Sequence, residues 1–361
     1  MKNIMSEQSI LDLFFKYKEN LNLDLKNKTI YTEAASGSYI YNSLFAAFCG
    51  ASHVFAETKD SSYASAKKVI DISSNLAEKL NLSKKITFLN SRNHEALSRS
   101  DIVTNSGFVR PLDRDLIDQL GPRTVIPLMW ETWEFREDEL DLDYCKKKSI
   151  LVMGTNENRE PVDMKYYSGL LALKFFFHFD FKLGKILLLG SPENFAKPMI
   201  DYFKRINICA LWASNEAKSD LKYKDLKNFL KKKGNQFTTI IVADHNQLDV
   251  IGPKGFISGK DIFEANPNLK VGIIAGGVSV NDLKRNSVEF FPKKIRPKGY
   301  MSYQPYVFGP EPVLKLFSGG LKVGQEMSKA RHAGLSCEEA AKIAITKSPA
   351  MDFTGKLSWI R

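Results

Sequence analysis

The feature that most constrains the fold is a short apolar run, Lys185 to Gly190, which reads Lys-Ile-Leu-Leu-Leu-Gly. A turn follows at Ser191 to Phe195, and an apolar-periodic run then continues to Cys209. A buried parallel strand leads into a crossover helix in this way, and the first such unit of a nucleotide-binding domain has the same layout. The run therefore predicts a parallel α/β sheet in which 185–189 is a strand.

Strand and helix patterns alternate along most of the chain, which favours parallel sheets with helices on both faces. The expected strands before the run are 29–35, 53–57, 86–89, 101–105, 124–129 and 150–154. Those after it are 208–213, 239–243 and 271–275. A long apolar helix is expected at 164–177 and further helices at 319–331 and 336–346.

The length of 361 residues suits two domains of about 150 residues each. We expect an α/β protein with two Rossmann-like domains, parallel sheets and an interdomain cleft. A flavodoxin-like substrate domain is expected at 1–160 together with 322–361. A Rossmann-like nucleotide-binding domain is expected at 161–321.

The net charge of +11 is spread along the whole chain, so it does not mark a single binding face. Its densest groups, 146–148 and 231–233, fall at expected helix ends, where cations favour the helix dipole. We therefore expect no nucleic-acid partner. No apolar run reaches the roughly 18 residues of a membrane span, and the N-terminus lacks a signal pattern. Four dispersed cysteines fit a reducing compartment, so a cytoplasmic location without membrane partners is expected.

The order of elements carries a resemblance to a known family. Ser98 to Asn105, the stretch Arg110-Pro111-Leu112-Asp113, two further strands and a long helix entering Lys185 follow one another. This order resembles the D-2-hydroxyacid dehydrogenases, and it continues through Ile273-Ile274-Ala275-Gly276-Gly277. The segment 33–66 is similar to the substrate domain of adenosylhomocysteine hydrolases and alanine dehydrogenases. The chain thus resembles a divergent member of this two-domain Rossmann superfamily.

The resemblance implies an NAD(P)-dependent oxidoreductase that acts on a small polar or anionic metabolite in the cleft. NAD or NADP would bind at the turn after the run at 185–190. Relatives commonly dimerise, so a homodimer is expected. The residues expected to bind the cofactor are Gly190, Ser191, Asn194, Ser214, Asp244, Gly276 and Gly277.

Several positions depart from the family pattern. The dinucleotide fingerprint has glycines where this chain has Pro192 and Phe195. The strand at 208–213 does not end in a ribose-binding acid, although Ser214 or Glu216 stands close behind it. The family's histidine has no counterpart in 301–306. These departures favour a second reading, a Rossmann-like protein that has lost dinucleotide binding and acts as a non-redox biosynthetic enzyme or partner protein.

His245 follows an expected strand, at the sheet edge where open α/β sheets bind ligands. With Asp244 or Asp249 orienting it, His245 is a candidate proton donor for a carbonyl substrate. The alternative is a polar loop in which the aspartate turns the backbone.

The stretch 130–136 also follows a strand and combines two tryptophans, two carboxylates and an arginine. Arg136 is a candidate clamp for a substrate carboxylate, and Glu131 is a candidate acid or base. The alternative is a loop that packs its aromatic side chains on a neighbouring domain or on another copy of the chain.

Four further residues are candidates for substrate binding. Ser36 begins a small-residue turn whose amides can bind an anion, or it is an ordinary N-cap serine. Arg110 is a candidate to orient a carboxylate. Asn156 and Lys165 are expected to face the cleft, or else to be solvated hinge residues. The histidines and cysteines show no metal-ligand spacing, so no metal site is expected.

Overall fold

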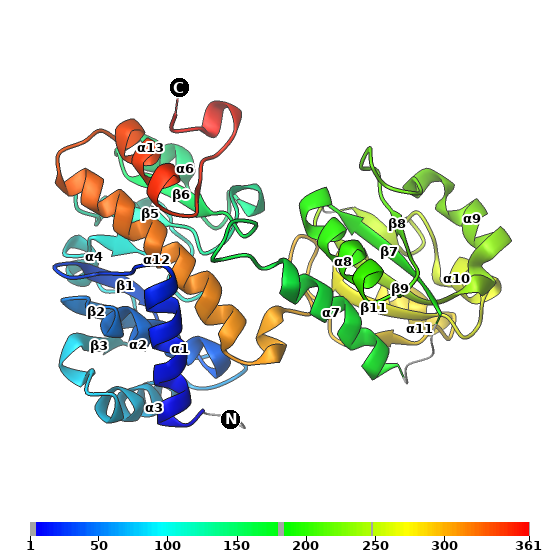
Figure 1. Ribbon diagram of the computed structural model, residues 1–361, viewed down its shortest axis with the longest axis horizontal. Coiled ribbons are helices and arrows are strands. Elements are labelled where there is room, and N and C mark those ends of the chain that lie inside the picture. The colour runs from blue at the N-terminus through cyan, green and yellow to red at the C-terminus, as the bar shows by residue number, and fades with distance from the viewer. Residues whose placement is uncertain (1–4, 180–183, 247, 361) are drawn as a thin grey trace. The chain divides into compact units, whose positions relative to one another are not determined.

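The structure is a computed structural model that describes residues 5–179, 184–246 and 248–360. The chain divides into two compact units, Met1–Asp163 with Phe308–Arg361, and Met164–Val307. Each unit is built on a largely parallel sheet covered by helices, which confirms the predicted α/β class with two Rossmann-like sheets (Figure 1).

The first unit contains a seven-stranded sheet in the order β14-β6-β5-β4-β1-β2-β3. All neighbouring strands are parallel except β14, which pairs antiparallel with β6. The order of β1 to β6 is that of the classic dinucleotide-binding sheet, and it differs from the flavodoxin-like order expected for this domain. The strands are β1 (Thr29–Glu33), β2 (His53–Glu57), β3 (Ile86–Leu89), β4 (Ile102–Val103), β5 (Val125–Pro127), β6 (Leu151–Thr155) and β14 (Ala350–Met351).

Helices cover both faces of this sheet, because its central strands are apolar at successive positions. Val125 and Leu151 belong to the core on one face, whereas Ile126 and Val152 belong to the core on the other. The first core includes α1 (Glu7–Asn20), α2 (Tyr41–Phe48), α3 (Ala66–Lys79), α12 (Glu311–His332) and α13 (Cys337–Lys347). The second includes α4 (His94–Ser98), α5 (Arg114–Asp118) and α6 (Leu142–Lys147).

The second unit has a five-stranded parallel sheet in the order β13-β11-β9-β7-β8, which is the flavodoxin-like order. A separate two-stranded sheet joins β10 to β12. The strands are β7 (Lys185–Ser191), β8 (Ala210–Ala213), β9 (Phe237–Asp244), β10 (Asp249–Ile251), β11 (Lys270–Ala275), β12 (Gly277–Val278) and β13 (Phe290–Phe291).

The helices of the second unit lie on both faces of its sheet (Figure 1). Leu187 and Leu189 of β7 belong to the core under α9, α10 and α11. On the other face α8 contacts β7, and α7 contacts α8 and β11. The helices are α7 (Lys165–His178), α8 (Glu193–Arg205), α9 (Leu226–Lys233), α10 (Gly259–Ala265) and α11 (Val280–Arg285).

The last long helix starts earlier than its sequence pattern indicates. It was expected at 319–331, but α12 spans Glu311–His332 and begins directly after Pro310. Residues 308–321, which the sequence analysis places in the second domain, lie in the first unit. The reason is packing, because α12 contacts β4, β5 and β6 of the first sheet.

Within the described residues, no helix is both long and apolar enough to cross a membrane.

A glycine lets α12 approach the sheet closely, and this makes a test of the packing. A β-carbon at Gly324 would lie 2.9 Å from Cγ2 of Ile102 and 2.9 Å from Cγ of Pro127. We expect Gly324→Val to lower the free energy of unfolding of the first unit by roughly 1–3 kcal/mol, because the overpacked sheet must shift. Urea denaturation followed by circular dichroism measures the change. Lys329→Val, at an exposed position of the same helix, should change stability far less.

Candidate functional site

Open parallel sheets bind ligands beyond the carboxyl ends of their strands, near the point where the strand order reverses. In the first unit this point lies between β1 and β4, and in the second unit between β7 and β9. The residues predicted from the sequence are divided between the two units. Those of the first unit are Ser36, Arg110, Glu131, Arg136 and Asn156, and those of the second are Lys165, Gly190, Ser191, Asn194, Ser214, Asp244, His245, Gly276 and Gly277.

Two loops of the first unit, one after β4 and one after β5, are tied together by hydrogen bonds. Asn105 Oδ1 accepts a hydrogen bond from the Met129 amide at 2.8 Å. The Leu112 amide donates to the Glu139 carbonyl at 2.9 Å. The sequence predicted Arg110 and Arg136 as separate candidates, and these bonds bring their two loops to one place.

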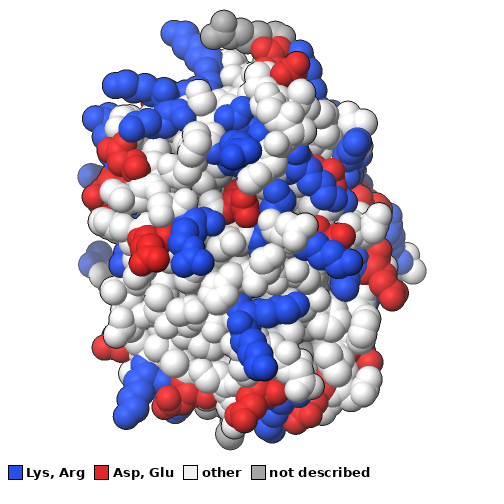
Figure 2. Space-filling model, turned by 90° about the vertical axis from the view of Figure 1, so that its left-hand side faces the viewer, with Lys and Arg blue, Asp and Glu red and all other residues white. Residues whose placement is uncertain are grey.

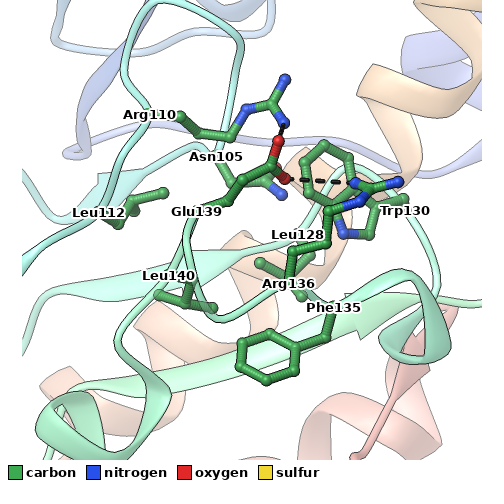
Figure 3. A pocket seen from close by; sticks show the side chains of 9 residues that line it. All are labelled: Asn105, Arg110, Leu112, Leu128, Trp130, Phe135, Arg136, Glu139 and Leu140. Carbon is green, nitrogen blue, oxygen red and sulfur yellow. Dashed lines mark hydrogen bonds and ion pairs between the residues drawn. The ribbon is translucent and has the colours of Figure 1, made fainter. Parts of the chain in front are cut away.

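Arg110 and Arg136 share one carboxylate, that of Glu139 (Figure 3). Arg110 Nη1 lies 2.5 Å from Glu139 Oε1, and Arg136 Nη1 lies 3.3 Å from Glu139 Oε2. The Arg110 guanidinium also lies over the Trp130 ring, 4.8 Å from its centroid. Two guanidinium groups that converge on one carboxylate form a natural anion-binding arrangement.

Three buried N–H groups beside these arginines have no hydrogen-bond acceptor among the described residues. They are Asn105 Nδ2, Arg110 Nε and Trp130 Nε1. All three side chains line a small cavity of about 10 Å³, which is room for one water-sized group. A buried donor without an acceptor costs about 1–3 kcal/mol, so three donors around one cavity favour a site that receives an acceptor from outside the chain.

Glu33, the last residue of β1, is a buried carboxyl group beside this arrangement. Its Oε2 accepts a hydrogen bond from the Phe108 amide at 3.0 Å. A β-carbon at Gly107 would lie 3.3 Å from that oxygen and 3.8 Å from Arg110 Nη2. Burial raises the pKa of Glu33, against the opposing effects of the Phe108 amide and the Arg110 charge. A carboxyl group whose pKa is raised by burial is a better candidate for a general acid than one at its usual pKa.

Glu131, the predicted acid or base, belongs to a group of carboxylates. It accepts hydrogen bonds from Trp133 Nε1 at 2.5 Å and from Asn158 Nδ2 at 2.9 Å. Burial raises the pKa of Glu134 to about 7, with the Arg136 charge opposing this and the Glu131 charge adding to it. Burial, Glu134 and Glu131 raise the pKa of Glu157. Glu134, after β5, and Glu157, after β6, are therefore neighbouring carboxyl groups with raised pKa values.

Three other predicted substrate residues lie elsewhere. Ser36 precedes a short 3₁₀ helix, Gly37–Ile40, on the loop after β1. The Asn156 amide donates to the Pro349 carbonyl at 2.7 Å, just after β6. Lys165 is the first residue of α7 and belongs to the second unit. Their roles in substrate binding stay predictions.

At the second edge, the predicted cofactor residues Ser191 and Ser214 do come together. Their hydroxyl groups lie 3.0 Å apart, and Ser191 Oγ also donates to Glu216 Oε1 at 3.0 Å. Close packing explains the glycine at position 190, since a β-carbon there would lie 2.8 Å from that of Ala196. Side chains from the loop after β8 thus form hydrogen bonds with the last residue of β7.

Asp244 and His245 lie at the end of β9, on the same edge. The Asp244 carboxylate accepts hydrogen bonds from Tyr223 Oη at 2.6 Å and from the Asn246 amide at 2.8 Å. Burial raises the pKa of Asp244, and the Tyr223 and Asn246 hydrogen bonds oppose the rise. The His245 ring contacts the Phe195 ring edge-on, with centroids 4.4 Å apart.

The remaining predicted cofactor residues have other surroundings. Asn194 is the second residue of α8 and is exposed. Gly276 adopts φ 124°, a left-handed backbone conformation, and a β-carbon there would lie 3.2 Å from the Asp244 carbonyl. A β-carbon at Gly277 would lie 2.3 Å from the Leu248 carbonyl, so close backbone packing requires glycine.

The charged side chains do not form one basic patch on the face of the molecule shown in Figure 2, where lysines and arginines are interleaved with acids. Across the described ranges, no group of three or more His, Cys, Asp or Glu side chains is arranged to hold a metal ion.

No family model matches the chain, and no curated protein matches it significantly. Among solved structures, the chain is similar to dipicolinate synthase A from Bacillus halodurans, with a TM-score of 0.50 and 10% identity over 82% of this chain and 96% of that chain. It also aligns with D-lactate dehydrogenase with NAD+ from Lactobacillus jensenii, with a TM-score of 0.48 and 13% identity over 86% of this chain and 98% of that chain. The chain thus shares its fold with dipicolinate synthase A at low sequence identity, which confirms the predicted resemblance at the level of the fold.

The raised pKa of Glu134 predicts how stability depends on pH. The folded protein holds this proton up to about pH 7, whereas the unfolded chain loses it near pH 4.5. Stability from this group is therefore complete below about pH 4.5 and is lost as the pH rises through about 7. Glu134→Gln should remove this loss and raise the free energy of unfolding by roughly 1–3 kcal/mol at about pH 8 relative to the parent protein.

Urea denaturation at about pH 5 and about pH 8 measures this effect. Glu137→Gln, an exposed change in the same loop, should keep the parent's pH dependence. A Glu134→Gln protein with the same slope as the parent would show that Glu134 does not hold the proton.

Proposed function

We propose that this protein is an enzyme that binds a small metabolite through its carboxylate at the carboxyl edge of the first unit. The observation that carries the proposal is the set of three buried donors without acceptors, on Asn105, Arg110 and Trp130, around one cavity. Arg110 itself and the neighbouring Arg136 supply positive charge. The cavity has room for one oxygen atom of an incoming carboxylate, which can accept from these donors, and the guanidinium groups can pair with the ligand once Glu139 moves aside.

The Glu139 carboxylate pairs with both arginines in the folded protein. A substrate carboxylate must therefore displace it. The Glu139 carboxylate contacts Arg110 through one oxygen and Arg136 through the other. When that carboxylate is released, the arginines can take a ligand of the same charge and shape. Glu33 then lies near the bound anion as a proton donor.

A dinucleotide at the end of β7 is the cofactor that the resemblance implies, and the residues there do not fit its pyrophosphate. The pyrophosphate needs backbone amides at a helix N-terminus and no side chains in the way. Here the Ser191 hydroxyl, at the end of β7, donates to the Glu216 carboxylate, so a negative charge lies at this turn. Pro192, the N-cap of α8, has no amide hydrogen. We therefore favour a non-redox enzyme, and no step is assigned to a nicotinamide.

An NAD(P)-dependent oxidoreductase is the second candidate. The observation that favours it is the position of Glu216, which follows β8 and reaches the end of β7. A carboxylate at that place binds the adenosine ribose in dinucleotide sites. The interdomain cleft, the homodimer, the cytoplasmic location and the roles of His245 and Glu131 stay predictions under either candidate.

Calorimetric titration with acetate, malonate and succinate tests the carboxylate site. We expect Glu139→Gln to bind at least one of these anions more tightly than the parent protein does, because the internal competitor is gone. Adding Arg110→Gln should weaken that binding roughly 10- to 100-fold, the value of one or two hydrogen bonds to a charged group. Arg114→Gln is the matched control, since Arg114 is exposed and pairs with Asp141 outside the cavity. Equal affinities in the Arg110→Gln and Arg114→Gln proteins would refute the site.

Titration with NADH and NADPH separates the two candidates. For a non-redox enzyme we expect no saturable binding that depends on the turn after β7. Binding that Glu216→Ala abolishes would instead support the oxidoreductase.

A further inference from the structure

A cavity of about 430 Å³ opens in the second unit beside the two-stranded sheet of β10 and β12. This volume is within the range of small-molecule sites. The cavity is lined by three stretches, 249–255, 276–279 and 295–298. Two of its lining residues, Gly276 and Gly277, were among those expected to bind the cofactor, but none belongs to the turns after β7 and β8, where the pyrophosphate was expected.

The floor of the cavity is apolar. Ile251 and Val278 are buried in the core of the unit and present their surfaces to the cavity. Ile295 packs against the same core from the third stretch, and Pro253 and Pro297 add apolar surface at the sides. A flat apolar group, such as an aromatic ring or a nucleobase, can lie on such a floor.

The rim of the cavity is basic. Its charged lining residues are Asp249, Lys254, Arg296 and Lys298, so three cations and one anion give a net charge of +2. The Lys298 Nζ lies 2.6 Å from the Asp249 carboxylate and matches its charge. Lys254 and Arg296, the other two charged lining residues, are both positive and exposed.

Backbone hydrogen bonds hold the walls in place. The Gly252 amide donates to the Ile257 carbonyl at 2.8 Å, and the Ser279 amide donates to the Ile251 carbonyl at 2.8 Å. The third stretch is fixed by the Arg296 amide, which donates to Ser302 Oγ at 2.9 Å. The cavity is therefore formed by the folded chain before any ligand enters, which reduces the entropy lost on binding.

We propose that this cavity binds an organic phosphate, with its apolar ring on the floor and its phosphate at Lys254 and Arg296. A phosphate monoester carries a charge of about −1.5 to −2 at neutral pH, which matches the net charge of the rim better than a single carboxylate does. Arginine pairs with phosphate oxygens in a bidentate manner. This site goes beyond the carboxylate site of the first unit and would give the protein a second ligand.

Calorimetric titration of the full chain with adenosine 5′-monophosphate tests the proposal, with adenosine and inorganic phosphate as the two partial probes. We expect saturable binding of the monophosphate, and binding at least about tenfold weaker for each partial probe, because each lacks either the rim or the floor contact. The double variant Lys254→Glu/Arg296→Glu should weaken binding of the monophosphate at least about tenfold.

The control is Lys231→Glu/Lys232→Glu on α9, which makes the same change in net charge at exposed positions outside the cavity. It should leave the affinity for the monophosphate nearly unchanged. The proposal is overturned by an absence of saturable binding, by adenosine binding as tightly as its monophosphate, or by equal losses in the two double variants. Loss of binding in Glu216→Ala alone would place the ligand at the end of β7 and would also overturn it. None of these variants alters Arg110 or Arg136, so the carboxylate site is tested separately.

Discussion

Parallel pairing of β1, β4 and β5 is the constraint on which the candidate site depends. Parallel strands all end at one edge of the sheet, so the segments that leave them meet there whatever their separation in the sequence. Glu33 ends β1, Arg110 lies on the loop after β4, and Trp130 and Arg136 lie on the loop after β5. The hydrogen bond between Asn105 and Met129 then fixes these loops against each other. The charges of the site lie close together because these loops converge at one edge of the sheet.

The carboxyl edges of the two sheets differ in their charged and hydrogen-bonding groups. In the first unit, two arginines share the Glu139 carboxylate, donors without acceptors lie beside them, and the carboxyl groups of Glu33 and Glu134 lie near the same two charges. In the second unit, the end of β7 faces Glu216 and the end of β9 carries Asp244, whose pKa burial raises. An edge with excess donors suits an anion, whereas an edge that has filled its donors with its own carboxylates does not. Two sheets of the same general fold therefore support different chemistry at their edges.

Much of the fold could be predicted from local pattern. The strands at 53–57 and 86–89 were predicted with their actual bounds, because a short apolar run between turn residues leaves little freedom. Arg110 and Arg136 were predicted as candidates to orient a carboxylate, and these roles stay predictions. Glu33, Asn105 and Glu139 were missed. For Glu33 and Asn105 the available signal was a carboxylate or an amide at or just after a strand end, but their importance depends on Phe108 and Met129, which are more than twenty residues away. Glu139 lies within a loop, and its pairing with Arg110 joins two positions that are far apart in the sequence.

The sequence by itself determined that two α/β units with parallel sheets would form, because apolar periodicity and turn residues act over a few neighbouring positions. It also showed that the turn after Gly190 lacks the glycines of a dinucleotide site. Only the tertiary structure decided which charges meet. It brought Arg110, Arg136 and Glu139 together, set Glu216 against Ser191 and opened the basic cavity beside β10. Electrostatic and hydrogen-bond energies depend on distances between side chains, and those distances exist only once the strands have paired.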